Sequence, residues 1–362
     1  MPLQKLQFQP GINRETTSYT NEGGWFDGDK VRFRQGFPEK IGGWEKIGVK
    51  SFLGSCRALW PWRTLNLDGY LGVGTHLKYY IESGEGYYDV TPVRSTTAAG
   101  DVTFSATDGS STITVSDPSH GAVVNDFVTF TDAVSLGGNI TAEVLNQEYQ
   151  INEIVDSSTY EIIAREVGSL DSITVDGQYT PTPVVANASD TGNGGSSVVG
   201  TYQINVGLDT SVTGSGWGAG AWARGTWGSA ATVDLITDTL RIWTHDNFGE
   251  DLLMNVTNGG IYYWDASAVN ALSNPAVALS DLAGADLAPT IATKVLISDV
   301  DRHVIAFGCD PLDNIGQQDP LLIRFSDQEN VTDWRPTTTN TAGDLRLGSG
   351  SKIVTAIETR QQ

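Results

Sequence analysis

The residues best suited to nucleophilic or acid–base chemistry are scattered along the sequence. The two cysteines and four histidines are separated from one another: Cys56, Cys309, His76, His120, His245 and His303. A catalytic nucleophile needs a base within hydrogen-bond reach, and no local motif pairs any of these residues. The chain also lacks the phosphate-binding motifs GxGxxG and GxxxxGKS/T. We therefore predict that the protein is not an enzyme and holds no cofactor or metal.

A group of carboxylates is a second candidate for chemistry. A Ca²⁺ loop needs oxygen ligands at alternating positions and a glycine, as in DxDxDG. Residues 298–301 (SDVD) supply half of that pattern. We interpret the acidic group as solvated loop residues: Asp299, Asp301, Asp310, Asp313 and Asp319.

The segment SDQENVTDW (326–334) is similar to the Asp box of sialidase-type propellers, SxDxGxxW. Its serine and tryptophan are one residue further apart than in that motif, and the glycine is missing. Asp boxes are structural turns, so the segment predicts a β-hairpin turn and gives little support for a glycosidase.

Aromatic and basic residues alternate in the stretch GGWFDGDKVRFRQGFPEKIGGWEK (23–46). Such interleaving could bind single-stranded nucleic acid, but nearby acids largely neutralise it. Aromatic residues and arginine are also enriched at protein interfaces. We predict a subunit or adaptor interface formed by Trp25, Phe26, Arg32, Phe33, Arg34 and Trp44.

Three tryptophans recur every five residues in GSGWGAGAWARGTWGS (214–229). The glycines permit tight bends, so the pattern predicts an aromatic ladder on an extended loop. Packing against a neighbouring surface is the favoured interpretation, and a sugar-binding platform is the alternative. The residues of this loop are Trp217, Trp222 and Trp227.

Charge is distributed unevenly along the 362 residues, whose net charge is −21. Residues 1–98 hold 12 Lys and Arg against 10 Asp and Glu, residues 99–210 hold 1 against 15, and residues 211–362 hold 9 against 18. An acidic chain does not sheathe DNA phosphates. The sequence has no apolar run that would span a bilayer, and its two cysteines make no disulfide framework.

Short β-branched and aromatic runs between turn residues predict an all-β chain. Residues 70–83, 252–266 and 303–327 share one form, in which a strand, a turn and a second strand follow one another, and 352–359 (KIVTAIET) opens a fourth copy. A period of about 40–50 residues is typical of propeller blades. We predict an N-terminal β region (1–94), an inserted acidic antiparallel module (95–204) and a propeller-like body (205–362).

Three smaller expectations accompany this division. A weak helix is expected within 268–286 and a loosely held connection at 186–200. A propeller must close, because open strand edges are a liability. We therefore expect either that the chain lacks the C-terminal part of the fold or that other strands complete it.

Long stretches of the sequence resemble tail proteins of short-tailed bacteriophages, namely the tail nozzle, tail tubular or packaged-DNA (head-to-tail) stabilisation proteins. These stretches are 10–46, 57–80, 207–228, 240–255 and 325–353. Residues 116–162 also resemble a small β module of phage structural proteins.

The resemblance implies a β-propeller-like body with a β-rich platform, in a hexameric ring below the portal adaptor. It implies a virion tail protein, assembled in the host cytoplasm, that retains packaged DNA and gives it an exit channel. The partners would be further copies of the chain, the adaptor and tail fibres or spikes. Double-stranded DNA would pass a lumen lined partly by the acidic residues without sequence-specific binding.

The alternative is a receptor- or carbohydrate-binding propeller of a tail spike. A host-cell adhesin is disfavoured because the first residues, MPLQKLQFQPGINRE, do not form a signal peptide.

Overall fold

The computed structural model describes residues 9–15, 17–21, 23–43, 51–168, 182–208 and 240–359. The chain divides into two units, residues 1–49 and 50–362. Within the described ranges nearly all regular structure is β-strand, which confirms the predicted all-β class. The exceptions are one short α-helix and two short 3₁₀ turns: α1 (Ala142–Leu145), η2 (Ala271–Ser273) and η3 (Leu279–Asp281).

The first unit is built around one hairpin, β1 (Val31–Arg34) and β2 (Phe37–Lys40). Its two turn residues, Gln35 and Gly36, both have positive φ, at 52° and 87°. Positive φ at both positions matches the twist of the flanking strands and gives a tight two-residue connection. We call the described residues 9–43 the arm.

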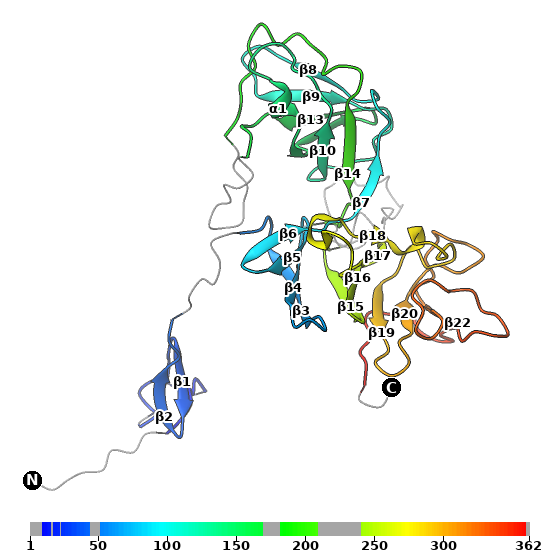
Figure 1. Cartoon of the computed structure of the whole chain (residues 1–362). Helices are drawn as coiled ribbons and strands as arrows, with labels where there is room; N and C mark the ends of the chain where they lie inside the picture. The colour runs from blue at the N-terminus through cyan, green and yellow to red at the C-terminus, as the bar shows by residue number, and fades with distance from the viewer. Residues whose placement is uncertain are drawn as a thin grey trace, which may run out of the picture. The chain divides into compact units, whose positions relative to one another are not determined.

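Three of the four-stranded antiparallel sheets of the second unit form its body, and we call them blades I, II and III (Figure 1). Blade I consists of β3 (Cys56–Arg63), β4 (Gly69–Thr75), β5 (Tyr79–Ser83) and β6 (Gly86–Asp89). Blade II consists of β15 (Trp243–Phe248), β16 (Asp251–Val256), β17 (Ile261–Trp264) and β18 (Val277–Ala278). Blade III consists of β19 (Lys294–Ile297), β20 (Val304–Phe307), β21 (Leu322–Phe325) and β22 (Gly343–Arg346).

The three blades follow one plan. In each, the strands pair in chain order, and the first strands lie next to one another, β3 beside β15 and β15 beside β19. This is the arrangement of consecutive propeller blades, so the propeller-like body is confirmed. The three repeats seen in the sequence are the second and third strands of the three blades.

Aromatic side chains fill the seam between blades I and II. From blade I, Trp62 and Tyr70 contact the buried Trp264 of blade II, with ring centroids 6.3 Å and 5.7 Å away. Tyr79 of blade I lies edge-on against Trp243 of blade II at 4.9 Å. Such pairs stabilise beyond their buried area, by about 0.5–1.5 kcal/mol each.

Two hydrogen bonds fix how blades I and II are aligned along this seam. The indole N–H of Trp243 donates to the carbonyl of Thr75 at 2.9 Å, and that of Trp62 donates to the carbonyl of Glu250 at 3.0 Å. Each bond joins segments that lie more than 160 residues apart in the chain. Buried indole N–H groups need such partners, so the bonds also set the register between the two sheets.

Glycines of β4 make room for the seam. A Cβ at Gly72 would lie 2.3 Å from the Tyr79 hydroxyl, and a Cβ at Gly74 would lie 2.7 Å from the Trp243 ring. These distances are shorter than side chains tolerate, so the alternation Gly-Val-Gly is required by packing. Gly69, at the start of the same strand, has no neighbour within 4 Å of its Cβ position.

Blades II and III share a second core of aliphatic side chains and small residues. It includes Leu253 and Ile261 from blade II, and Val295 and Val304 from blade III. The Asp246 carboxylate accepts the backbone N–H of Ile297 at 2.8 Å, which joins β15 to β19.

The predicted inserted module is an antiparallel sandwich of two four-stranded sheets. One sheet has the order β11-β10-β14-β7, from β11 (Glu148–Gln150), β10 (Phe127–Thr131), β14 (Val199–Gln203) and β7 (Val93–Thr96). The other has the order β12-β13-β9-β8, from β12 (Glu153–Asp156), β13 (Thr159–Ile163), β9 (Thr112–Ser116) and β8 (Thr103–Ala106). The hydroxyls of Tyr160 and Tyr202, 2.7 Å apart, join the two sheets inside one apolar core.

Several local expectations change. Residues 268–286 form η2, β18 and η3 rather than a helix, in keeping with the interruption by Pro275. Residues 186–200 are firmly held, because the buried Asp190 carboxylate accepts backbone N–H groups of Gly138, Ile140 and Asn187 at 2.6–2.9 Å. Residues 352–359 form no ladder with any strand in the described chain.

Gly74→Ala is expected to destabilise the body by about 1–3 kcal/mol, because its Cβ would overpack the Trp243 ring. Gly69→Ala, on the same strand, is the matched control and should change stability by less than about 0.5 kcal/mol. Urea unfolding followed by tryptophan fluorescence measures both. Equal stability of the two variants would show that the seam tolerates a wider spacing.

His245 should make the body sensitive to mild acid. It lies in the seam with Trp60 at 5.2 Å, and burial lowers the pKa of His245 to about 4. The unfolded chain takes up this proton near pH 6.5, so stability should fall as the pH drops from about 6.5 to about 4, by up to about 3 kcal/mol. Urea unfolding of wild type and His245→Phe across this range should show the loss in the wild type alone. Parallel curves would contradict the assignment.

Candidate functional site

The arm brings together five of the six residues predicted as an interface, and Trp44 lies outside the described residues. The rings of Trp25 and Phe33 are 6.2 Å apart, and an isolated β-bridge joins Ile12 to Trp25. The Arg14 guanidinium lies 5.9 Å from the Phe26 ring. Sequence reasoning did not single out Arg14, because its contacts with Phe26 and Asp27 depend on the fold.

The two faces of the arm hairpin carry different side chains. Cross-strand pairing puts Arg32 opposite Glu39 and Arg34 opposite Phe37 on one face. The Arg32–Glu39 ion pair, at 3.1 Å, is exposed and worth little to stability. The hydrogen bond from Arg14 is the main reason that the pKa of Asp27 lies below its usual value.

None of the described arm residues is buried. Phe37 is 72% exposed, and Tyr19 and Ile41 are also exposed. A unit of this size that exposes large apolar side chains gains little from folding alone. The arm therefore exposes apolar side chains that its own described residues do not cover.

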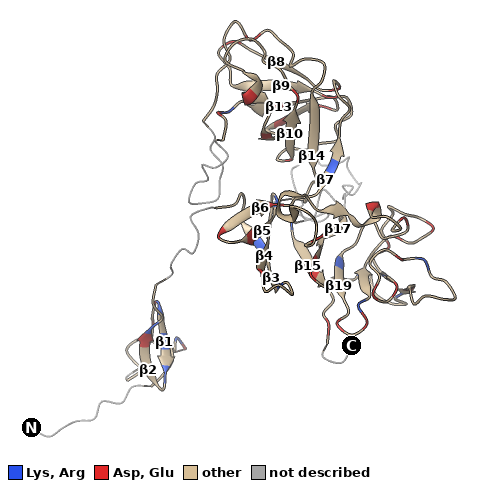
Figure 2. Ribbon diagram, in the orientation of Figure 1, with Lys and Arg blue, Asp and Glu red and all other residues tan. Residues whose placement is uncertain are grey.

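The acidic residues predicted as one group are divided between the two ends of blade III. Asp299 and Asp301 are exposed in the turn between β19 and β20. Asp313 is exposed and Asp319 is half-buried in the loop between β20 and β21, at the opposite end because the strands are antiparallel. Figure 2 shows acidic residues at several separate positions along the ribbon of the body.

Two of these acids have structural partners. Asp310 is fully buried, and its carboxylate accepts from the N–H of Thr290 at 3.0 Å and that of Gly316 at 2.8 Å. Asp310 is therefore a loop residue that fixes its neighbours, and it is buried rather than solvated as expected. Asp319 pairs with Arg346 at 2.6 Å.

The predicted aromatic ladder of Trp217, Trp222 and Trp227 lies outside the described residues. SDQENVTDW forms the first part of the long turn that connects the paired strands β21 and β22. The indole N–H of Trp334 donates to Val331 within that turn, and the buried ring lies 5.9 Å from the Arg324 guanidinium.

Potential nucleophiles and metal ligands are not clustered. In the described ranges no group of three or more His, Cys, Asp or Glu is placed to hold a metal ion. Burial raises the pKa of Cys309 to about 12 and also raises the pKa of Cys56, so both thiols are poor nucleophiles. Among the described helices none is long and apolar enough to cross a bilayer.

The inserted module is fixed to blade I by a buried lysine that the sequence analysis missed. The Lys78 side chain is 2% exposed, and its ammonium contacts Asp89 of blade I at 2.6 Å and Glu148 of the module at 2.5 Å. It also lies 4.3 Å from the Phe127 ring centre. Gln203 of the module donates to the Asp89 carboxylate at 3.1 Å, so polar contacts cross the boundary twice.

Burial and neighbouring charges have opposite effects on the pKa values of the groups in this cluster. Burial alone would lower the pKa of Lys78, but the carboxylates of Asp89 and Glu148 raise it above its usual value. The pKa of Asp89 is lowered despite burial because Lys78 neutralises its charge. Burial keeps the pKa of Glu148 above its usual value even beside Lys78. The three charges therefore depend on one another.

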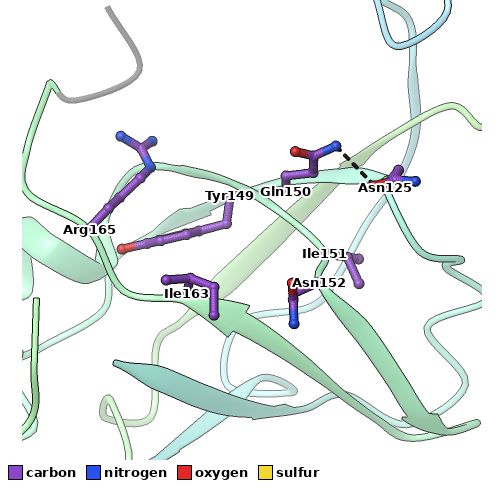
Figure 3. A pocket seen from close by; sticks show the side chains of 7 residues that line it. All are labelled: Asn125, Tyr149, Gln150, Ile151, Asn152, Ile163 and Arg165. Atoms are coloured by element: carbon purple, nitrogen blue, oxygen red, sulfur yellow. Dashed lines mark hydrogen bonds between the residues drawn. The ribbon is translucent and has the colours of Figure 1, made fainter. Parts of the chain in front are cut away.

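A pocket of about 180 Å³ opens on the module beside β11 (Figure 3). Amide side chains from Asn125, Gln150 and Asn152 line it, and Gln150 donates to Asn125 at 3.2 Å. At its other end the Arg165 guanidinium lies 5.2 Å from the Tyr149 ring. The lining therefore combines amide groups and one guanidinium with the apolar side chains of Ile151 and Ile163, so it offers hydrogen bonds beside apolar contact.

Comparison with known proteins adds little. No protein-family model matches the sequence, and no curated protein matches it. Among solved structures, the endosialidase of phage phi92 is similar over 81% of this chain and 37% of its own, with 13% identity and a TM-score of 0.21. This chain therefore spans little more than a third of that protein, and a likeness this weak carries no argument.

Lys78→Met is expected to destabilise the body by about 3–5 kcal/mol, because it leaves Asp89 and Glu148 buried without a counter-charge. Adding Glu148→Gln removes one of these charges and should recover part of the loss. Urea unfolding measures both variants. A loss below about 1 kcal/mol for Lys78→Met, or no recovery in the double variant, would contradict a coupled cluster.

Proposed function

We propose that this chain is a structural protein of a bacteriophage tail, part of the nozzle ring below the portal adaptor. The observation that carries the proposal is the arm, which presents aromatic side chains and arginine but has no buried residue in its described part. Such a surface suits an assembly protein because it becomes ordered and buried on a neighbour. The resemblance of residues 10–46 and 325–353 to tail nozzle proteins gives the same assignment.

In this role the body would be the rigid part of each subunit. The arm would dock on a neighbouring copy or on the adaptor, and the propeller-like blades would surround the exit channel for packaged DNA. The exposed carboxylates of Asp299, Asp301 and Asp313 would repel DNA phosphates, so DNA would pass without binding. The acidic module would contact fibres or spikes.

Ring formation by six copies, location in the virion tail and assembly in the host cytoplasm belong to the same proposal. The role requires no reaction and no cofactor.

The second candidate is a receptor- or carbohydrate-binding protein of a tail spike. The amide-lined pocket of the module favours it, since Asn and Gln side chains both donate to and accept from hydroxyl groups. Glycan-array binding that Asn152→Ala abolishes would support this candidate over the nozzle.

The arm should be required for assembly but not for folding of the body. Arg34→Glu with Phe37→Ser removes the cation and the exposed ring that lie opposite each other on β1 and β2. Self-association or adaptor binding should weaken by about tenfold or more, the effect of losing an interface anchor. Sedimentation velocity over a concentration series measures it.

Leu67→Ser is the matched control, because Leu67 is equally exposed but lies on the body, at the turn between β3 and β4. It should leave assembly unchanged. Thermal unfolding of the body should be the same in all three proteins. Association that is as strong in the arm variant as in wild type would contradict the proposed role of the arm.

A further inference from the structure

The cluster around Lys78 contains the groups that an amide-forming reaction needs. The Lys78 nitrogen lies 2.6 Å from one oxygen of Asp89, Oδ2, and the lysine side chain is 2% exposed. A lysine amine is a nucleophile once it has lost a proton, and here it is held next to a carboxyl group. Holding two reacting groups in contact lowers the barrier to their reaction, because the cost of bringing them together is already met by the fold.

The two oxygens of the Asp89 carboxylate have different partners. Oδ1 accepts the backbone N–H of Thr91 at 2.9 Å and its hydroxyl at 2.6 Å. Oδ2 accepts from Lys78 and from the side-chain amide of Gln203 at 3.1 Å. Fixed donors stabilise the negative charge that develops on a carboxyl oxygen when a nucleophile attacks. Oδ1 is therefore the oxygen that is held during an attack, and Oδ2 is the oxygen placed to leave.

Glu148 supplies a base on the nitrogen. Its carboxylate lies 2.5 Å from the Lys78 nitrogen and comes from β11 of the module. Although burial opposes the charge of Lys78, Asp89 and Glu148 raise its pKa, so the nitrogen must pass a proton to a base before it can attack. Burial raises the pKa of Glu148, which suits this carboxylate to take up a proton and release it again.

Apolar rings keep water from the cluster. The ring centre of Phe127 lies 4.3 Å from the Lys78 nitrogen, and Phe127 and Tyr80 are both buried in one small core. Two charges in such surroundings are costly, because both have lost their hydration. A neutral amide in place of the ion pair removes that cost. Exclusion of water also protects an amide from hydrolysis.

We propose that Lys78 and Asp89 form an intramolecular amide, an isopeptide bond from the residue before β5 to the last residue of β6. Nζ attacks Cγ of Asp89, the Nζ–Cγ bond forms and the Cγ–Oδ2 bond breaks. Glu148 carries two protons from Nζ to Oδ2, which leaves as water, and Glu148 ends as the carboxylate that it was. One positive and one negative charge disappear together, so the step balances and needs no other reactant.

The bond strengthens the part of blade I that carries the module. β5 and β6 already pair, with Tyr80 opposite Asp89. The amide adds a covalent link at this position, and Glu148 accepts its N–H in place of the ammonium. The contact between blade I and the module is therefore kept after the reaction. This inference concerns the body and does not rest on the proposed function.

Tryptic digestion of the denatured full chain, followed by mass spectrometry, tests the bond. Trypsin cleaves after Lys78 only while its side chain is a free amine. Residues 64–94 should therefore remain one peptide, uncut at Lys78 and lighter than its sequence by one water molecule. Fragmentation of this peptide should place the link between Lys78 and Asp89.

Glu148→Gln keeps the size of the side chain but removes the base, so cleavage after Lys78 should return and the peptides should have their full mass. Asp89→Ala removes the reacting carboxyl group and should give the same result. Glu153→Gln is the matched control, because Glu153 is exposed on β12 of the same module. It should retain the linked peptide. The wild-type peptide decides the proposal even where a variant fails to fold.

Separate wild-type peptides 64–78 and 79–94 at full mass would overturn the proposal. Loss of water with normal cleavage after Lys78 would also overturn it, because the water would then come from another site, such as the Asp68-Gly69 pair in the same peptide. A link from Lys78 to Glu148 would contradict the assignment of Asp89 as the reacting carboxyl group.

Discussion

The rest of the body depends on the aromatic seam between blades I and II. In the sequence the whole inserted module separates the two sheets. In the fold they contact each other through aromatic rings such as those of Tyr79 and Trp243. Close approach of the two sheets requires the glycines of β4, so the seam constrains backbone and side chains at once. Once it forms, β15 lies beside β3, and β19 can pack on β15 through the second core. Loss of the seam would leave each blade with one uncovered apolar face.

Insertion of a sandwich between two blades raises a mechanical problem, because a flexible link would let the module swing. The Lys78 cluster addresses it by placing one cation between a carboxylate of each part. Breaking such a buried pair costs more than it contributes when intact, so it favours one geometry over others. Phe127 adds apolar contact at the same boundary, since it joins the small core of Leu53, Val73 and Tyr80. The module is therefore held as a fixed projection of blade I.

The arm and the blades differ in physical character. The arm has no buried residue and combines rings with cations, whereas the blades pack against one another through two apolar cores. An exposed arm and a packed body are therefore separated along this chain. Among the described residues, no group of three or more His, Cys, Asp or Glu side chains is placed to hold a metal ion.

The sequence by itself determined the all-β class, the repeated strand pairs, the antiparallel insertion and the residues of the arm. These follow from period-two patterns, turn residues and local composition, which act over a few residues. The tertiary structure alone decided the partners of single polar groups. In the sequence Asp310 is not distinguishable from other loop acids, but in the fold it is buried among backbone N–H groups. Lys78 is likewise not distinguishable from a surface lysine, but in the fold it joins two domains. Burial and pairing depend on contacts between residues far apart in the chain, such as the 70 residues from Lys78 to Glu148, and no local pattern records them.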